Sequence, residues 1–228
     1  MGQEVLSASY PVSPSMEFMA IALKKGIIHV DAIAPETAER DIHIIGPQGG
    51  TVSLDTGQSV IVPAHALSET IPVDIETIDP DDPALIIPDG FTFVGALNIS
   101  FANHHLDVPA ILSVPLPDSI SPEGQFLLVK MVDTTEKTEA VLVGRGSVEA
   151  GTVTSTYDLD QDSDAQLPGV ISGGRYVFIK AEQPLGFAAG TVFDPDGAAK
   201  PQALVTSSGV ALASLAGPDG QYVASVPI

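Results

Sequence analysis

The residues best suited to hold a metal ion are four aspartates at alternate positions in one short stretch. They are Asp158, Asp160, Asp162 and Asp164. Carboxylate oxygens are preferred ligands of Ca²⁺, and the calcium loop of a helix–loop–helix site places ligands at its positions 1, 3 and 5. Ser163 replaces the turn glycine of such a loop, and Gly169 replaces the bidentate glutamate at its last ligand position. The spacing therefore predicts a looser calcium site or, alternatively, a solvated acidic loop, and we expect no other cofactor.

Two further groups carry metal-ligand side chains in patterns that fix no coordination geometry. One is an acidic cluster interrupted by proline, which consists of Asp79, Asp81 and Asp82. Its prolines predict a rigid turn. The other is the pair His104 and His105, with Asp107 nearby. Adjacent residues of a strand face opposite sides, so the two histidines can bind one zinc ion only if they lie in a loop.

The sequence contains none of the familiar patterns of nucleophilic catalysis. Cysteine is absent, which excludes thiol nucleophiles, disulfides and cysteine-based zinc sites. Ser172 precedes Gly173 and Gly174 but lacks the preceding glycine of a nucleophile elbow, and a strand rather than a helix is expected after it. Tryptophan, common in sugar-binding clefts, is also absent. We therefore expect no catalytic residue and no enzymatic activity.

The charge of the chain limits its partners. It carries 29 acidic and 9 basic residues, a formal net charge of −20, and no Lys or Arg stands between Arg40 and Lys130. Such a surface repels phosphate groups, so we expect neither nucleic acid nor anionic lipid as partners. No apolar run approaches the roughly 20 residues that span a bilayer, so we expect no membrane insertion. Residues 1–10 also lack the basic and apolar segments of a signal peptide.

Short runs rich in Val, Ile, Thr and Leu, punctuated by 19 prolines and 21 glycines, indicate an all-β chain. About ten such runs lie within residues 46–182, a spacing typical of an antiparallel β-sandwich. Two more runs lie within residues 18–33 and are separated by Lys24, Lys25 and Gly26, which predict a hairpin turn. This hairpin is too small to fold alone.

The start of the predicted sandwich has a family resemblance. The residues that carry it are Gly49, Gly50, Val60, Ile61, Val62, Pro63, Ala66, Leu67 and Thr70. They resemble the β-sandwich module of zona-occludens proteins, netrin receptors and ankyrins, and His65 stands where that module usually has glycine. Some relatives of the module cut a Phe-Ser bond within themselves. Here Phe101 is followed by Ala102, so the resemblance implies no self-cleavage.

A second resemblance lies beyond residue 182. It is carried by Gly190, Thr191, Val192, Asp196, Gly197, Ala203, Leu204, Val205, Asp219, Gly220 and Tyr222. These residues resemble the first half of the transthyretin-like domain of carboxypeptidase regulatory regions and bacterial surface arrays, whereas residues 26–37 resemble its second half. The two resemblances imply a sandwich at residues 46–182, a smaller transthyretin-like sheet at residues 183–228, and strands within residues 1–45 that complete this sheet.

Half of a sheet exposes unpaired backbone groups along its edge and favours a partner strand. Three arrangements follow. In the first, the chain is a segment of a tandem array. In the second, the two half-domains close on each other within one chain, and in the third they complete each other between neighbouring copies. We expect a non-enzymatic structural or adhesive module of an extracellular or cell-surface protein, a filament or array subunit with protein partners at its edge strands. The alternative is a calcium- or ligand-binding accessory module attached to an enzyme.

The calcium hypothesis predicts a measurable stabilisation. If the four aspartates bind Ca²⁺ in the folded protein only, millimolar calcium raises the melting temperature, since a ligand at 100 times its Kd stabilises by about 2.7 kcal/mol. Differential scanning calorimetry with and without CaCl₂ measures this shift. Magnesium at the same concentration is the control, and an unchanged melting temperature in calcium would remove the site.

Overall fold

The computed structural model describes residues 20–24, 27–31, 43–83, 85–135, 137–158 and 166–228. The chain forms two compact units, Met1–Asp41 and Ile42–Ile228. The described residues form 17 strands and no helix. The prediction of an all-β chain is therefore confirmed.

The described part of the first unit is one pair of strands. β1 (Ala20–Lys24) pairs antiparallel with β2 (Ile27–Asp31), and Lys24 lies opposite Ile27. These strands confirm the two strand-like runs expected within residues 18–33. A two-stranded sheet of this length is at best marginally stable in water, so it needs a further packing partner.

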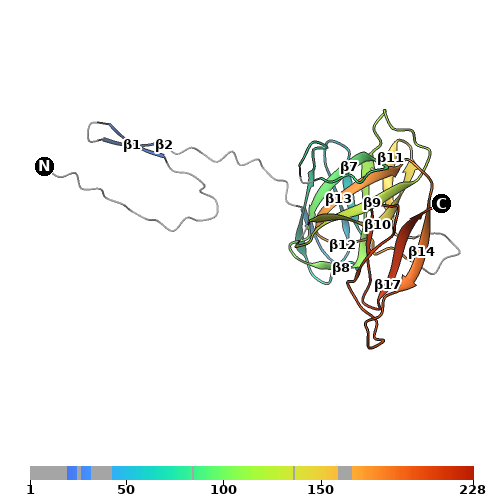
Figure 1. Cartoon of the computed structure of the whole chain (residues 1–228). Helices are drawn as coiled ribbons and strands as arrows, with labels where there is room; N and C mark the ends of the chain where they lie inside the picture. The colour runs from blue at the N-terminus through green and yellow to red at the C-terminus, as the bar shows by residue number, and fades with distance from the viewer. Residues whose placement is uncertain (1–19, 25–26, 32–42, 84, 136, 159–165) are drawn as a thin grey trace. The chain divides into compact units, whose positions relative to one another are not determined.

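Ten strands of the second unit form one antiparallel sheet that is nearly closed into a barrel (Figure 1). In spatial order they are β3 (His43–Ile45), β6 (Ile71–Thr77), β7 (Phe91–Ser100), β13 (Gly174–Ala181), β9 (Phe126–Asp133), β10 (Thr138–Glu149), β11 (Thr152–Thr156), β8 (His105–Pro115), β5 (Ser59–Val62) and β4 (Gly50–Ser53). A short branch, β12 (Val170–Ser172), pairs with β8. The strands β4 to β13 all lie within residues 46–182, in agreement with the number expected there.

A tight turn joins the two ends of this sheet. The first and last strands of the spatial order, β3 and β4, are consecutive in the chain, and Gly46 forms an isolated bridge with Gly49 between them. The Gly49 N–H donates to the Gly46 carbonyl at 2.9 Å. Gly49 has a φ of 76°, and a Cβ at this position would overlap the carbonyl oxygen of Val62. The turn therefore requires glycine both for its backbone angle and for the close approach of β5.

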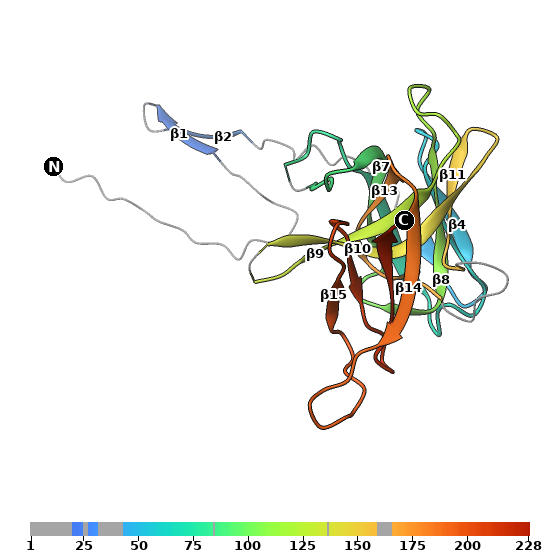
Figure 2. The same cartoon turned by 45° about the vertical axis from the view of Figure 1, so that its right-hand side comes forward.

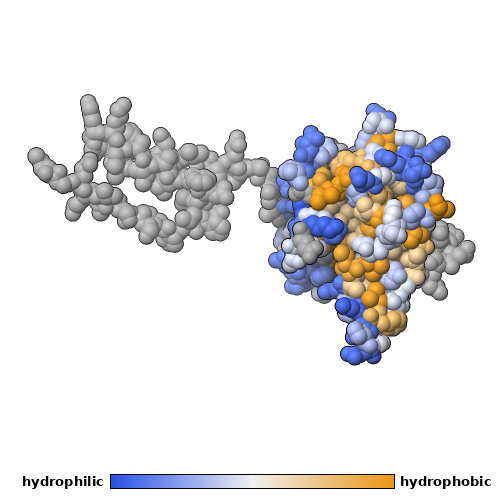
Figure 3. Space-filling view, in the orientation of Figure 1, coloured by the Kyte–Doolittle hydropathy of each residue, from blue (hydrophilic) through white to orange (hydrophobic). Residues whose placement is uncertain are grey.

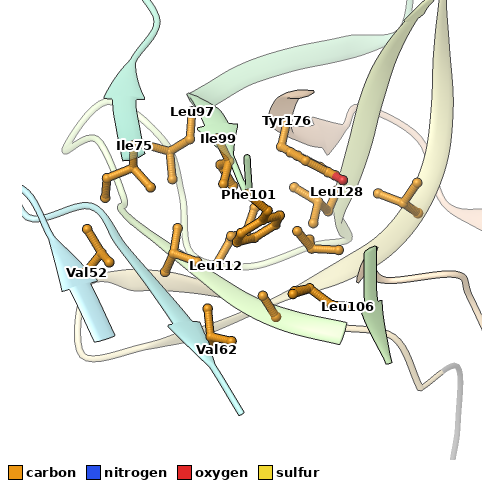
Figure 4. Packing of buried hydrophobic residues seen from close by; sticks show 14 of the residues in the cluster. Val52, Val62, Ile75, Leu97, Ile99, Phe101, Leu106, Leu112, Leu128 and Tyr176 are labelled. Atoms are coloured by element: carbon orange, nitrogen blue, oxygen red, sulfur yellow. The ribbon is translucent and has the colours of Figure 1, made fainter. Parts of the chain in front are cut away.

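The inner face of the sheet encloses the main hydrophobic core. Val52, Val60 and Leu112 are completely buried, and the aromatic rings of Phe101 and Tyr176 lie among them (Figure 4). In strands that line this core, such as β5 and β6, buried and exposed positions alternate. One residue in two therefore points into the core, as the strand period requires.

Two central strands depart from this alternation. β9 and β13 are buried along most of their length on both faces, with Leu128 and Phe178 in the inner core and Leu127 and Val177 in a second cluster. The same second cluster contains Val223 and other apolar residues from the end of the chain, namely Leu185, Val210 and Leu212. The continuous apolar runs of β9 and β13 are thus explained by a second layer that covers their outer face.

The C-terminal strands supply this layer (Figure 2). β14 (Leu185–Thr191) pairs antiparallel with β17 (Gln221–Pro227) in a separate two-stranded sheet. β15 (Leu204–Thr206) pairs with β16 (Ala213–Leu215), and β16 meets β10 through the pair Val141 and Ala213. The domain boundaries expected near residues 45 and 182 stay predictions.

The closing turn can be tested with two matched glycine substitutions. Gly49→Ala and Gly151→Ala both place a side chain at nearly the same backbone angle, φ 76° and 77°, but a Cβ at Gly151 meets open space. We expect Gly151→Ala to lower the free energy of unfolding by about 1–2 kcal/mol from backbone strain alone. Gly49→Ala should cost about 1–3 kcal/mol more because it also overpacks against β5. Urea denaturation measures both, and equal losses would show that the turn does not constrain the barrel.

Candidate functional site

The structure describes only one of the four aspartates predicted to bind calcium. Asp158 is exposed, forms an isolated bridge with Gln166, and its Oδ1 accepts a hydrogen bond from Gln166 Nε2 at 3.4 Å. Asp160, Asp162 and Asp164 lie outside the described residues. Within the described ranges, no three His, Cys, Asp or Glu side chains lie close enough to hold a metal ion. The calcium site stays a prediction.

The acidic cluster interrupted by proline forms a hydrogen-bonded turn. The Asp81 N–H donates to Asp79 Oδ1 at 2.9 Å, and the Asp82 N–H donates to the Asp79 carbonyl at 3.0 Å. The first carboxylate of the cluster is thus used by the local backbone. The cluster thus forms a turn, as its prolines predict.

The histidine pair lies at the start of a strand, with His105 as the first residue of β8 and His104 just before it. His104 Nε2 lies 3.1 Å from Glu69 Oε1, and its Nδ1 lies 3.0 Å from the Ala102 carbonyl oxygen. The hydrogen bond to Glu69 raises the pKa of His104, because the protonated ring can donate from both nitrogens. This pair stabilises the fold below the ordinary histidine pKa and ceases to do so as the pH rises through the raised value. His104 is thus engaged with Glu69, and among the described residues it belongs to no group of three potential metal ligands.

A different feature, the outer edge of β14, presents free backbone groups. Leu185, the first residue of β14, donates its N–H to Gln125 Oε1 at 2.6 Å, and its carbonyl accepts from Gln125 Nε2 at 2.9 Å. Both backbone groups of Leu185 therefore point away from β17. Since an antiparallel ladder repeats every two residues, the N–H and C=O groups of Phe187, Ala189 and Thr191 point the same way.

The Gln125 side chain thus occupies the place of a neighbouring strand, but only at the first position of this edge. None of the described residues forms a hydrogen bond with the outward-facing backbone groups of Phe187 or Ala189. Ala189 is exposed, and Phe187 is half-buried with its ring centroid 5.7 Å from the Arg145 guanidinium carbon. The open edge therefore begins immediately after the residue that Gln125 caps.

The opposite edge of the same small sheet is closed by serine side chains. Ser207 Oγ donates to the Ser225 carbonyl at 2.6 Å, and Ser214 Oγ donates to the Val223 carbonyl. These carbonyls belong to β17 and point away from β14. Two hydroxyl groups therefore satisfy carbonyls of one edge, whereas among the described residues β14 has a comparable cap only at Leu185.

The sequence of β14 also lacks the features that normally protect an edge strand. Its seven residues, LGFAAGT, include no charged residue and no proline. Lysine, proline and strong bulges are the usual means of preventing another chain from pairing with an exposed edge. Apolar side chains cover the part of the surface where β14 and β17 lie (Figure 3). An added strand would thus find both backbone partners and an apolar surface.

Sequence reasoning expected a small sheet within residues 183–228, but it did not identify β14 as an edge strand or the residues that define its open side. Gln125 and Leu185 are 60 positions apart, and a glutamine beside a strand has no pattern that marks it as a cap. The fold and this edge define the class of protein as an all-β protein with an open strand edge.

Comparison with models of known protein families and with curated proteins found no match to this chain. No helix among the described residues has the length and apolar character needed to cross a membrane.

The assignment of the two faces of β14 predicts an alternating pattern of hydrogen exchange in dilute solution. The amides of Ala188 and Gly190 bond to β17 and should exchange slowly, whereas the amide of Ala189 should exchange quickly because it faces outward. Amide exchange followed by NMR resolves the three residues, and Ala188 serves as the internal control. Equal protection of Ala188 and Ala189 in the dilute protein would show that the edge is already paired.

Proposed function

We propose that this chain is a non-enzymatic structural and adhesive module of an extracellular or cell-surface protein, joined to neighbouring copies by strand pairing. The observation that carries the proposal is the open edge of β14, where the outward backbone groups of Phe187 and Ala189 have no hydrogen-bond partner among the described residues. A strand added at such an edge gains main-chain hydrogen bonds along its length, which is the general mechanism of strand addition.

The strand that we propose to add comes from the β1–β2 hairpin of a neighbouring copy. This hairpin is a two-stranded sheet of five residues in each strand, and such a sheet is marginal in isolation. The β14–β17 sheet is also two-stranded. Pairing the two would give a sheet of four strands, a size more typical of stable sheets. Repetition from copy to copy would build an array or filament.

Local geometry supports the finer interpretation of the fold as a sandwich of the zona-occludens, netrin-receptor and ankyrin type. His65, which stands where that module usually has glycine, has a φ of 67°, in the left-handed region that glycine favours. Gly49, the first residue of the glycine pair, is required by its backbone angle and by the proximity of Val62. Both features fit the resemblance at the positions that carry it.

The transthyretin-like interpretation of residues 183–228 is supported by two turns. The Gly197 N–H donates to the Asp194 carbonyl, and the Gly220 N–H donates to the Gly217 carbonyl, each at 3.0 Å. Both glycines have positive φ, as the repeated Pro-Asp-Gly pattern requires. The acidic surface is consistent with a protein partner rather than nucleic acid or anionic lipid.

Two proline substitutions on β14 test the strand pairing. Ala189→Pro removes an outward N–H and blocks an added strand, while the ladder with β17 stays intact. We expect the wild-type protein to increase in mass with concentration and Ala189→Pro to remain monomeric with a similar melting temperature. Ala188→Pro is the matched control because it removes an N–H that bonds to β17, and it should lower the melting temperature. Light scattering and calorimetry measure the two effects.

Three outcomes would contradict the proposal. A wild-type monomer at millimolar concentration, with a fast-exchanging Ala189 amide, would exclude pairing. A monomer with a protected Ala189 amide would support closure within one chain in place of pairing between copies. Labelling of Ser172 by a fluorophosphonate would contradict the non-enzymatic character, since the Ser172 hydroxyl lies 2.6 Å from the amine of Lys130.

A further inference from the structure

A groove of about 960 Å³ lies at one end of the main sheet, a volume within the range of small-molecule sites. One side consists of β9, β10 and β13, another is β12, and the segment around Leu215 and Pro218 forms the third. Val141, Val143 and Leu215 line it with apolar side chains that also belong to, or pack against, the inner core. The groove therefore opens onto the core of the barrel.

One charged residue stands at a position of β9 that normally holds an apolar side chain. Leu128 and Val132 face the inner core, and Lys130 lies between them at the strand period of two. The Lys130 Nζ donates to Ser172 Oγ at 2.6 Å and lies 5.4 Å from the centroid of the Tyr176 ring. An ammonium group on the inner face is informative because lysine is rarely buried without a partner.

The structure holds Lys130 in place with neighbouring groups. The Tyr176 hydroxyl donates to the Ser172 carbonyl at 2.6 Å, and burial raises the pKa of Tyr176 to about 12, so the phenol stays protonated at neutral pH. Gly174, with a φ of 140°, leaves space for the lysine stem, because a Cβ there would lie 2.8 Å from Lys130 Cε. Ser172, Gly174 and Tyr176 thus form the surroundings of the amine.

The ammonium of Lys130 lacks a carboxylate partner within the described part of the chain, although acidic residues greatly outnumber basic ones. The neighbouring Arg175 differs, since its Nη2 contacts both carboxylate oxygens of Asp133 at 3.0 Å. Lys137 also differs, with its Nζ 3.1 Å from Glu139 Oε1. Burial lowers the pKa of Lys130, which reflects the cost of the uncompensated charge. An anion beside it would offset this cost.

We propose that this groove binds a small amphiphile with a single carboxylate, whose carboxylate contacts Lys130 Nζ and Ser172 Oγ and whose apolar body lies against Val141, Val143 and Leu215. The amine has donors left after its bond to Ser172, and the Ser172 hydroxyl can donate its own hydrogen to the second carboxylate oxygen. The apolar lining accounts for the rest of the ligand. This inference is independent of strand pairing at β14, which lies outside the groove lining.

Isothermal titration calorimetry of the 228-residue chain uses three probes, which are octanoate, 1-octanol and butyrate. We expect octanoate to bind, and both 1-octanol, which lacks the charge, and butyrate, which lacks most of the chain, to bind at least tenfold more weakly. Lys130→Met keeps the length of the side chain and removes the charge, and it should weaken octanoate at least tenfold. Lys137→Met, outside the groove, is the control and should leave octanoate affinity unchanged.

A second variant keeps the proposal testable if Lys130→Met fails to fold. Ser172→Ala removes the hydroxyl alone and should weaken octanoate severalfold without changing the affinity for 1-octanol. Absence of octanoate binding to the wild-type protein would overturn the proposal. It would also be overturned by equal affinities for octanoate and 1-octanol, or by octanoate binding that neither substitution changes. None of these results depends on the mass of the protein in solution, so failure here is distinguishable from failure of strand pairing.

Discussion

The structure depends on covering both faces of β9 and β13. Leu127, Val129 and Val177 on the outer face are completely buried, and burial of each such side chain contributes about 1.5–3 kcal/mol. Three of them together approach the lower end of the stability of a whole domain, about 5–15 kcal/mol. The main sheet thus relies on Leu185 and Val223 of the β14–β17 sheet and on Val210 and Leu212 of the segment between β15 and β16, and this C-terminal layer relies on the sheet. This mutual burial holds β14 against the main sheet, and beyond Leu185 the outer edge of β14 has no hydrogen-bond partner at Phe187 or Ala189 among the described residues.

The two proposed sites share one physical basis, a polar group that the fold leaves without its usual partner. On β14 the groups are backbone N–H and C=O groups, which an added strand would satisfy. In the groove the group is the ammonium of Lys130, which a carboxylate would satisfy. An unsatisfied polar group has a high cost only where water is excluded. The exposed edge can therefore remain unpaired in the free protein, whereas half-buried Lys130 has the stronger demand for a counterion.

Much of the fold was predictable from sequence because strand formation depends on local pattern. Alternation in β5 and β6, the turn glycines and the runs on β9 and β13 all mark strands without knowledge of the tertiary structure. The partners of those strands were not predictable, because the cap of Leu185 by Gln125 and the contact of Lys130 with Ser172 join residues distant in sequence. Lys130 is the one charged residue in the apolar run from Phe126 to Val132. A single lysine in a strand usually indicates an exposed position, so the sequence did not mark Lys130 as part of a site.

The second layer has a consequence for synthesis of the protein on the ribosome. The chain emerges from its N-terminus, so β9 and β13 leave the ribosome before Leu212 and Val223, which cover their outer face. During this interval the nascent chain exposes Leu127, Val129 and Val177 to water and to other nascent chains. The main sheet is therefore most prone to aggregation in the interval between the synthesis of β13 and the docking of β17, and a chaperone that acts on this protein would have to protect that face during this interval.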